Sequence, residues 1–277
     1  MLSRSLEIAA ATGLSAAAVT ATLAHATFNA RCAWCGPLVS RGTRDGLPRI
    51  ALTFDDGPWP GATDRVLDIL ADLDVKAAFF VIGQYVDRHP DLIRRIDREG
   101  HLIGNHTYDH LGLSFLRGAA FWRDQLDRTD AAIERATGLR PRLYRPPLGM
   151  KTRISSRAAG QSHITVTWTR TARDGLATTS DRILARLVPH SRPGDILLLH
   201  DGVSPQSRRD PSVTVSALPP LIGGLRDRGL QPVRLDQLTG MTPYSSSKVM
   251  THRPDERLNL EPGCVSPVWT EGPDEPS

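Results

Sequence analysis

Two histidines and two adjacent aspartates have the types and spacing of a metal centre. His106 and His110 stand four residues apart, and Asp55 and Asp56 directly follow an apolar run. Two imidazoles and one carboxylate form the ligand set of a catalytic divalent metal ion that keeps a position open for water. Because surface and capping histidines also occur at this spacing, the histidine pair alone is weak, and the neighbouring carboxylates strengthen the interpretation.

The two aspartates are expected to divide two roles between them. Adjacent side chains of a strand point to opposite faces, so Asp55 and Asp56 should not point the same way. One of them would then bind the metal ion, while the other accepts a proton from the attacking water. The alternative is an acidic turn, because Gly57 and Pro58 follow, and Gly-Pro is common in turns.

Three further polar residues could support a proton-transfer reaction. His200 closes an apolar run of three leucines and could act as a general acid, with Asp174 orienting it and stabilising its charge. The alternative for His200 is a buried histidine bonded to a backbone carbonyl. Arg145 could keep Asp55 ionised through a charge-assisted pair, and its alternative is a surface salt bridge.

The elements that carry these residues follow the pattern of an α/β fold. Short β-rich runs alternate with amphipathic stretches, and the strands are mostly continuous apolar runs, as in a parallel sheet covered by helices. We predict seven strands, at residues 50–54, 77–82, 101–104, 142–144, 164–168, 195–199 and 231–235. We predict helices at residues 63–73, 90–99, 115–137, 180–190 and 213–228. The pattern favours a closed or nearly closed barrel in which the seven polar residues converge at the carboxyl ends of the strands.

The N-terminal segment has the composition of a targeting signal. No Lys, Arg, Asp or Glu occurs between Glu7 and Arg31, and an A-x-A site at residues 24–26 would let a mature chain begin at Thr27. We therefore predict a signal peptide at residues 1–26. The alternatives are an uncleaved membrane anchor and an ordinary amphipathic helix. Either form of targeting would make the protein secreted, periplasmic or cell-envelope facing.

The rest of the chain divides into three parts. Residues 27–47 are expected to form a linker, and residues 48–240 a single catalytic domain. Residues 241–277 are rich in Pro, Ser and Gly and show no periodicity, which predicts a largely disordered tail.

Composition excludes several classes of protein. The chain has 277 residues, 40% of them hydrophobic, and a net charge of only +4, which excludes global disorder and names no nucleic-acid partner. Three cysteines exclude a small disulfide scaffold. Cys32 and Cys35 lack the strand and helix context of a redox motif, and Cys264 gives no second pair for a zinc ribbon. A local disulfide or free thiols remain. No G-x-S-x-G or phosphate-binding P-loop motif occurs.

Five ordered motifs resemble those of the polysaccharide deacetylases with the NodB homology domain, carbohydrate esterase family four. The motifs are TFDD at residues 53–56, HTYDH at 106–110, RPP at 145–147, Asp174 and LLLH at 197–200. The resemblance implies a distorted α/β barrel of about seven parallel strands and one divalent metal ion, with Zn²⁺ expected and Co²⁺, Ni²⁺ or Mn²⁺ as alternatives. It also implies removal of N-acetyl or O-acetyl groups from a carbohydrate polymer such as peptidoglycan, a chitin-like glycan or poly-N-acetylglucosamine.

The resemblance also implies a role for each motif residue. Asp56, His106 and His110 would be the metal ligands. Asp55 would be the base and His200 the acid, with Arg145 tethering Asp55 and Asp174 tuning His200. The backbone N–H of Leu148 would help to bind the tetrahedral oxyanion, because the preceding residue, Pro147, has no N–H to donate.

Two residues depart from the motif pattern. Leu148 and Gly175 stand where the resemblance leads one to expect aromatic side chains, which predicts a wider acyl pocket unless Trp59 or Met150 fills the space. Two alternative functions stay open: an amidase or esterase acting on a substrate that is not a polysaccharide, and a non-catalytic glycan-binding protein. The second is disfavoured, because all proposed ligands and both proton-transfer residues are present.

Overall fold

The computed structural model describes the chain except for residues 1–17, 44, 161, 177, 208 and 246–277. Its centre is a curled parallel sheet with the strand order β5-β4-β3-β2-β1-β7-β6, and β8 pairs with the start of β1. The strands are β1 (Arg49–Asp55), β2 (Ala78–Val81), β3 (Leu102–Asn105), β4 (Leu143–Tyr144), β5 (Ile164–Thr165), β6 (Arg170–Thr171), β7 (Ile196–His200) and β8 (Gln231–Pro232). The predicted distorted barrel of about seven parallel strands is confirmed.

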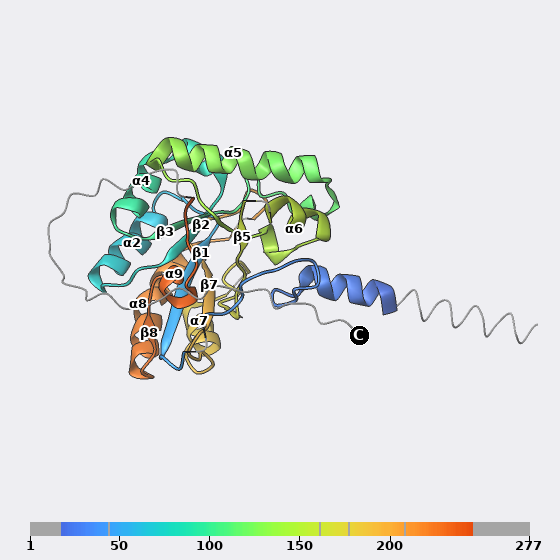
Figure 1. Cartoon of the computed structure of the whole chain (residues 1–277). Coiled ribbons are helices and arrows are strands. Elements are labelled where there is room, and N and C mark those ends of the chain that lie inside the picture. The colour runs from blue at the N-terminus through green and yellow to red at the C-terminus, as the bar shows by residue number, and fades with distance from the viewer. Residues whose placement is uncertain (1–17, 44, 161, 177, 208, 246–277) are drawn as a thin grey trace, which may run out of the picture.

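Helices surround the sheet on its outer side (Figure 1). They are α2 (Thr63–Asp72), α3 (Gly83–Arg88), α4 (Pro90–Arg98), α5 (Ala119–Thr137), α6 (Arg153–Ala159), α7 (Ser180–Leu187), α8 (Ser212–Asp227) and α9 (Leu235–Thr239), with 3-10 turns η1 (Ser114–Leu116) and η2 (Pro147–Gly149). All five predicted helices are present within four residues of the expected ends. The short helices α3, α6 and α9 were not predicted, because five to seven residues carry too little periodicity to distinguish a helix from a loop.

Side chains of the central strand β1 alternate between two apolar clusters. Ile50, Leu52 and Phe54 pack outward among residues of α2 and α8, whereas Ala51 belongs to the cluster inside the barrel. A strand that is buried on both faces explains the continuous apolar runs of the sequence. Asp55 follows Ala51 by four residues, so strand alternation directs it to the interior side as well.

The predicted strand 164–168 is wrong as a single element. Its residues divide between β5, which pairs with β4, and the approach to β6, which pairs with β7 at the other end of the strand order. The chain crosses there from one edge of the sheet to the other. Val39 lies at this crossing and forms a parallel bridge with Val166, while Arg41 forms an antiparallel bridge with Asp195.

These bridges place part of the expected linker 27–47 within the folded domain. The backbone of Val39 bonds residues on both sides of Val166, and Gly42 donates to the carbonyl of Gly194. The domain also extends past the expected boundary at residue 240, because Arg142 donates to the carbonyl of Pro243 at 2.8 Å. The rest of the predicted disordered tail, from residue 246, lies outside the described residues.

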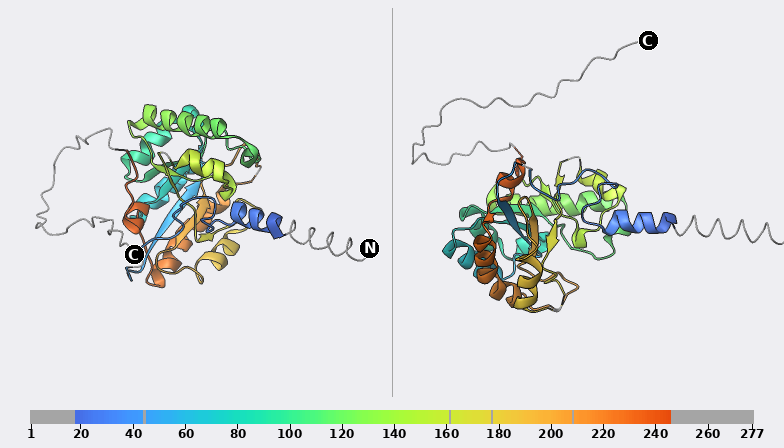
Figure 2. Two further views of the ribbon diagram at one scale, coloured as in Figure 1. Left: turned by 45° about the vertical axis from the view of Figure 1, so that its right-hand side comes forward. Right: turned by 90° about the horizontal axis from the view of Figure 1, so that it is seen from below.

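The N-terminal helix projects from the domain (Figure 2). Residues 18–28 are helical, and residues 18–25 of this helix are exposed. Most of the predicted signal peptide, residues 1–17, lies outside the described part of the chain. Among the described residues, no helix combines the length and the apolar character needed to cross a membrane. Cys32 and Cys35 are free thiols, and Cys264 lies outside the described residues.

Candidate metal centre and catalytic site

A cavity of about 290 Å³ opens at the carboxyl ends of the parallel strands. All seven polar residues singled out in the sequence gather at this end of the sheet. The cavity is lined by Asp55, Asp56, His106, His110, Leu148, Trp168, Thr171, Arg173, Gly175, Leu176, Leu198 and His200. Arg145 and Asp174 lie behind this lining and contact Asp55 and His200 respectively.

Three buried side chains form a candidate metal centre. One ligand atom each from Asp56, His106 and His110 lies within 4.8 Å of the others. Asp56 Oδ1 is 3.3 Å from His110 Nε2 and 3.6 Å from His106 Nε2, and it has no hydrogen-bond partner among the described residues. A buried carboxylate oxygen without a donor is costly, and a bound cation would remove that cost. The three atoms therefore suit a divalent metal ion.

The orientation of His106 leaves its Nε2 atom free to bind a cation. Its Nδ1 atom lies 2.7 Å from the backbone carbonyl oxygen of Arg145. Because a carbonyl oxygen only accepts, Nδ1 must carry the proton, and the lone pair of Nε2 then faces Asp56. Burial, together with the neighbouring His110, lowers the pKa of His106 to about 3. His106 is thus a neutral imidazole, which is the form that binds metal.

The loop that carries both histidines is fixed by α5. Asn105, the last residue of β3, donates through Nδ2 to Asp130 Oδ1 at 2.7 Å and accepts from the Thr107 N–H at 2.9 Å. Thr107 and His110 both have positive φ angles, of 68° and 49°. The side chain of Asn105 therefore joins the helix to a loop whose backbone turns sharply between the two histidines.

Asp55 forms a buried ion pair inside the barrel. Arg145 Nη1 lies 2.7 Å from Asp55 Oδ1 and 2.9 Å from Thr53 Oγ1. Arg145 is fully buried, and its guanidinium lies 4.0 Å from the centre of the Phe80 ring. Gly104 makes this packing possible, since a Cβ there would lie 2.6 Å from the Phe80 ring. The surface salt bridge considered for Arg145 is excluded.

Burial raises the pKa of Asp55 above its ordinary value, and Arg145 opposes the shift by favouring the carboxylate. A carboxylate with a raised pKa binds a proton more readily than an exposed aspartate does. The site of Asp55 thus suits a residue that takes up a proton during the reaction.

The expectation that the two aspartates point apart is wrong. Asp55 and Asp56 both line the cavity, and both lie within 4 Å of His106 Nε2, at 3.7 Å and 3.6 Å. The reason is that β1 ends at Asp55 and Asp56 has a φ angle of 73°, in the left-handed region. Asp56 therefore lies beyond the strand, and strand alternation does not direct its side chain away from that of Asp55. Their division of labour must rest on their partners, since only Asp55 contacts Arg145.

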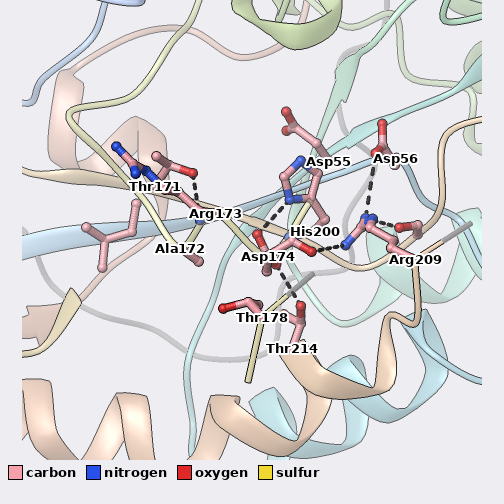
Figure 3. Close-up of polar contacts among 12 residues, drawn as sticks. Asp55, Asp56, Thr171, Ala172, Arg173, Asp174, Thr178, His200, Arg209 and Thr214 are labelled. Atoms are coloured by element: carbon pink, nitrogen blue, oxygen red, sulfur yellow. Dashed lines mark hydrogen bonds and ion pairs between the residues drawn. The ribbon is translucent and has the colours of Figure 1, made fainter. Parts of the chain in front are cut away.

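His200 and Asp174 form a second polar pair (Figure 3). His200 ends β7, which lies on the other side of β1 from β3 in the strand order. His200 Nδ1 lies 2.8 Å from Asp174 Oδ1, and the backbone N–H of His200 donates to Asp174 Oδ2 at 2.8 Å. Thr214 donates to the same Oδ2 atom at 2.6 Å. Because the partner of Nδ1 is a carboxylate, the alternative of a histidine held only by a backbone carbonyl is excluded.

The charge of Asp174 stabilises a protonated His200. Burial by itself lowers the pKa of His200, but the charge and hydrogen bond of Asp174, together with the charge of Asp56, raise the pKa above its ordinary value. The side chain of His200 is 16% exposed and lines the cavity, so its Nε2 side can reach a bound substrate. The pair therefore has the properties of a general acid and the group that orients it.

Arg209 is a site residue that the sequence analysis missed. Its Nη2 atom lies 3.6 Å from Asp56 Oδ2, and its Nη1 atom donates to the carbonyl of Asp174 at 3.3 Å (Figure 3). It also donates to the carbonyl of Gly202. Arg209 thus joins the segment with the metal ligand Asp56 to the segment with Asp174. No local pattern marks it, because it lies in a polar loop outside the motifs.

The acyl side of the cavity is not closed by the residues that we considered. Trp59 packs against Tyr85, with ring centres 5.4 Å apart, and neither Trp59 nor Met150 lines the cavity. Trp168 does line it, and among the described lining residues it is the one Phe, Tyr or Trp. Gly175 borders the cavity beside His200, where an added Cβ would lie 3.2 Å from His200 Cε1. The predicted role of the Leu148 N–H stays a prediction, although Leu148 lies in the lining.

Comparison with known proteins identifies the family. A model described as polysaccharide deacetylase matches residues 43–167. The chain is 38% identical over 204 residues to a chitooligosaccharide deacetylase of Bradyrhizobium sp. (strain ANU 289), in a match that covers 71% of this chain and 93% of that relative. The chain belongs to the polysaccharide deacetylase family. The resemblance seen in the five motifs is confirmed.

Solved structures of this polysaccharide deacetylase family share the fold. The Bc1960 peptidoglycan N-acetylglucosamine deacetylase is similar with a TM-score of 0.68 and 30% identity, over 74% of this chain and 94% of that one. BA3943 of Bacillus anthracis, described as a family pseudoenzyme, is similar with a TM-score of 0.65 and 28% identity, over 72% of this chain and 67% of that one. Because the family includes a pseudoenzyme, catalysis has to be argued from the residues of the site.

Proposed function

We propose that this member of the polysaccharide deacetylase family is a metal-dependent hydrolase that removes N-acetyl groups from an amino-sugar polymer. The observation that carries the proposal is the placement of two proton-transfer groups around one candidate metal centre. Asp55 is paired with a buried arginine, and His200 is paired with a buried aspartate. The names of the chitooligosaccharide and peptidoglycan deacetylases that resemble the chain support this substrate class.

Asp56, His106 and His110 would hold the metal ion, and Zn²⁺ is our proposed ion, with Co²⁺, Ni²⁺ and Mn²⁺ as alternatives. A set of two imidazoles and one carboxylate is typical of catalytic zinc. When bound, such an ion supplies Lewis-acid polarisation of an acyl carbonyl and of water. The neutral state of His106 and the donor-free Oδ1 atom of Asp56 both suit this ligand set.

Asp55 is the proposed general base. It lines the cavity within 4 Å of His106 Nε2, so it lies beside the candidate ligands without being held as one of them. Arg145 fixes Asp55 Oδ1, which leaves Oδ2 as the oxygen that accepts the proton of the attacking water. The raised pKa of Asp55 increases its affinity for that proton.

His200 is the proposed general acid. Its Nδ1 atom is occupied by Asp174, so the proton that it donates is the one on Nε2. That proton would go to the departing sugar amine as the carbon–nitrogen bond breaks. After the step, the Asp174 carboxylate favours renewed protonation of His200, which prepares the site for another turnover. We also propose that the backbone N–H of Leu148 donates a hydrogen bond to the tetrahedral oxyanion.

The alternatives differ in observable products. An amidase or esterase would release an acyl group from a non-polysaccharide substrate, and a glycan-binding protein would release none. The full set of charged pairs around the cavity argues against the binding protein, because buried charges are costly to keep without a function. The purified protein should be assayed for released acetate with chitin oligomers, peptidoglycan and acetylated xylan. We expect most acetate from N-acetylated glycans, and acetate from xylan alone would favour an O-acetyl esterase.

We also propose that the protein acts outside the cytoplasm, either secreted or facing the cell envelope. The uncharged run between Glu7 and Arg31 and the A-x-A site at residues 24–26 support this location. N-terminal sequencing of protein from the native host should find Thr27 as the first residue. A soluble cytoplasmic protein that still begins at Met1 would contradict the proposal.

A further inference from the structure

A second cavity, of about 470 Å³, adjoins the catalytic cavity and shares Thr171 and Arg173 with it. It lies between β6 and α7. Its lining residues are Thr169, Arg170, Thr171, Arg173, Arg182, Ala185, Arg186 and His190. Four of these eight residues are arginines and none is acidic. We call this second cavity the arginine groove. Figure 3 shows Thr171 and Arg173 on one side of the Asp174–His200 pair, with Arg209 on the other.

Three of the four arginines of the groove have no ion-pair partner among the residues that the structure describes. Arg170 is paired with the buried Asp195 at 2.8 Å, so its charge is offset. Arg173, Arg182 and Arg186 form no ion pair with any described residue. Asp181, the acidic residue in the first turn of α7, is exposed and does not line the groove.

One of these arginines has an oriented guanidinium, and a second stands at a fixed point of the backbone. Arg186 Nη1 donates at 3.0 Å to both the carbonyl of Ala172 and the hydroxyl of Thr178, two neutral acceptors that orient the guanidinium without cancelling its charge. Arg173 has a φ angle of 55°, and its backbone N–H donates to Thr171 Oγ1 at 3.0 Å, which fixes the backbone at this residue. An oriented guanidinium such as that of Arg186 loses less freedom on binding, and any of the groove arginines can form paired hydrogen bonds to carboxylate or phosphate oxygens.

We propose that the arginine groove binds an anionic substituent, a carboxylate or a phosphate, on the glycan whose acyl group occupies the catalytic cavity. The inference rests on the proposed function and narrows its substrate class to acidic glycans. Arg173 is the residue that connects the two sites, because it lines both cavities. Arg182, which lines only the groove, would contact the anionic group without contacting the acyl group.

The test compares three forms of the same chitin oligomer: neutral, oxidised to a carboxylate at C6, and phosphorylated at C6. We expect kcat/KM to be about tenfold higher for at least one charged oligomer than for the neutral one, as a charge-assisted bidentate contact would give. The two charged forms distinguish carboxylate from phosphate binding. The preference should shrink as the salt concentration rises, because salt screens partly exposed charges.

Three variants locate the preference. Arg182→Gln should lower the ratio of kcat/KM for charged and neutral oligomers several-fold, through KM. Arg173→Asn combined with it should remove the preference, and asparagine is chosen because it tolerates a positive φ angle. Arg135→Gln is the matched control, since Arg135 is an exposed arginine of α5 paired with Asp87 away from both cavities. The control should keep the full preference.

Binding is measured separately by calorimetry in the Asp55→Asn background, where the oligomer is not consumed. Tighter binding of a charged oligomer, weakened by Arg182→Gln, supports the arginine groove even if no acetate is released, in which case only the proposed function fails. Equal binding and equal kcat/KM for all three oligomers would overturn the inference while leaving deacetylation of the neutral oligomer intact.

Discussion

Two histidines at the same cavity have opposite electrostatic settings. His106 follows β3, and its Nδ1 atom donates to a backbone carbonyl, whereas His200 ends β7, and its Nδ1 atom meets the carboxylate of Asp174. The pKa of His106 is lowered to about 3, and that of His200 is raised. A neutral partner leaves burial to dominate, but a buried anion outweighs burial. The partner of Nδ1 thus determines whether the histidine suits the role of a metal ligand or that of a proton donor.

Replacing each histidine by alanine should have the largest effects and should separate the two roles. We expect His106→Ala to lose both activity, by more than about a thousandfold, and bound metal, because it removes one of three ligands. His200→Ala should lose activity by about a hundredfold or more but retain the metal. Elemental analysis of protein purified without chelators measures the difference. Equal metal contents in both variants would remove the distinction.

Substitutions of the two aspartates should also separate proton transfer from metal binding, with somewhat smaller effects than the histidine substitutions. Asp55→Asn should lower kcat by about a hundred- to ten-thousandfold with metal still bound, since it removes a proton acceptor. Asp56→Asn should weaken metal binding as well, because Asp56 Oδ1 faces both histidines. The two variants are each other's control, as the residues are adjacent and equally buried. Similar metal affinities would show that the contact with Arg145 does not set their roles.

Asp174→Asn tests the raised pKa of His200 through the pH profile. The general acid must be protonated, so the alkaline limb of kcat/KM reports the pKa of His200. Removing the Asp174 charge should lower that pKa and move the limb to lower pH, with a loss of activity of about a hundredfold near neutral pH. The acidic limb, which we assign to Asp55, should stay in place. An alkaline limb that does not move would mean that another group is the acid.

Gly175→Trp should cause the smallest change that we predict, a change in acyl selectivity. It is read as a ratio between two substrates, because a Cβ at this position would lie 3.2 Å from His200 Cε1 and would also disturb the general acid. A Trp at this position would add an apolar wall beside His200, and each buried methylene contributes about 0.8 kcal/mol. The measured quantity is the ratio of kcat/KM for N-acetyl glucosamine oligomers to that for N-butyryl glucosamine oligomers. We expect this ratio to be smaller in wild type than in the variant. If wild type rejects the butyryl oligomers as strongly as the variant does, Trp168 already closes the pocket.

The sequence predicts the parts of the site that depend on periodicity and order along the chain. Apolar runs end just before Asp55, His106, Arg145 and His200, and parallel strands bring such ends together. The structure confirms this placement. The sequence does not predict the left-handed backbone at Asp56, because a single φ angle has no periodic signature and aspartate tolerates this region.

Two other features depend on contacts between distant segments. The strand β6 has only two residues, too few for a pattern, and its pairing with β7 separates it from the predicted strand 164–168. Arg209 acts on Asp56 across more than 150 positions of the chain, from a loop with no regular element. Such contacts follow from the closure of the barrel and are not visible in any local window of sequence.

The most direct test of the contrast between His106 and His200 is nitrogen NMR of ¹⁵N-histidine-labelled, zinc-loaded protein across a pH titration. We predict that His106 keeps a protonated Nδ1 and an unprotonated, metal-shifted Nε2 from about pH 5 to 9, because Nδ1 donates to the Arg145 carbonyl and Nε2 is the proposed zinc ligand. In metal-free protein His106 should also stay neutral over this range, because its pKa lies near 3. His200 should titrate above the ordinary histidine value of about 6.5, and its pKa should fall in Asp174→Asn, where burial is no longer opposed by the Asp174 charge. A His106 that titrates near 6.5, or a His200 that stays neutral at pH 5, would contradict the account.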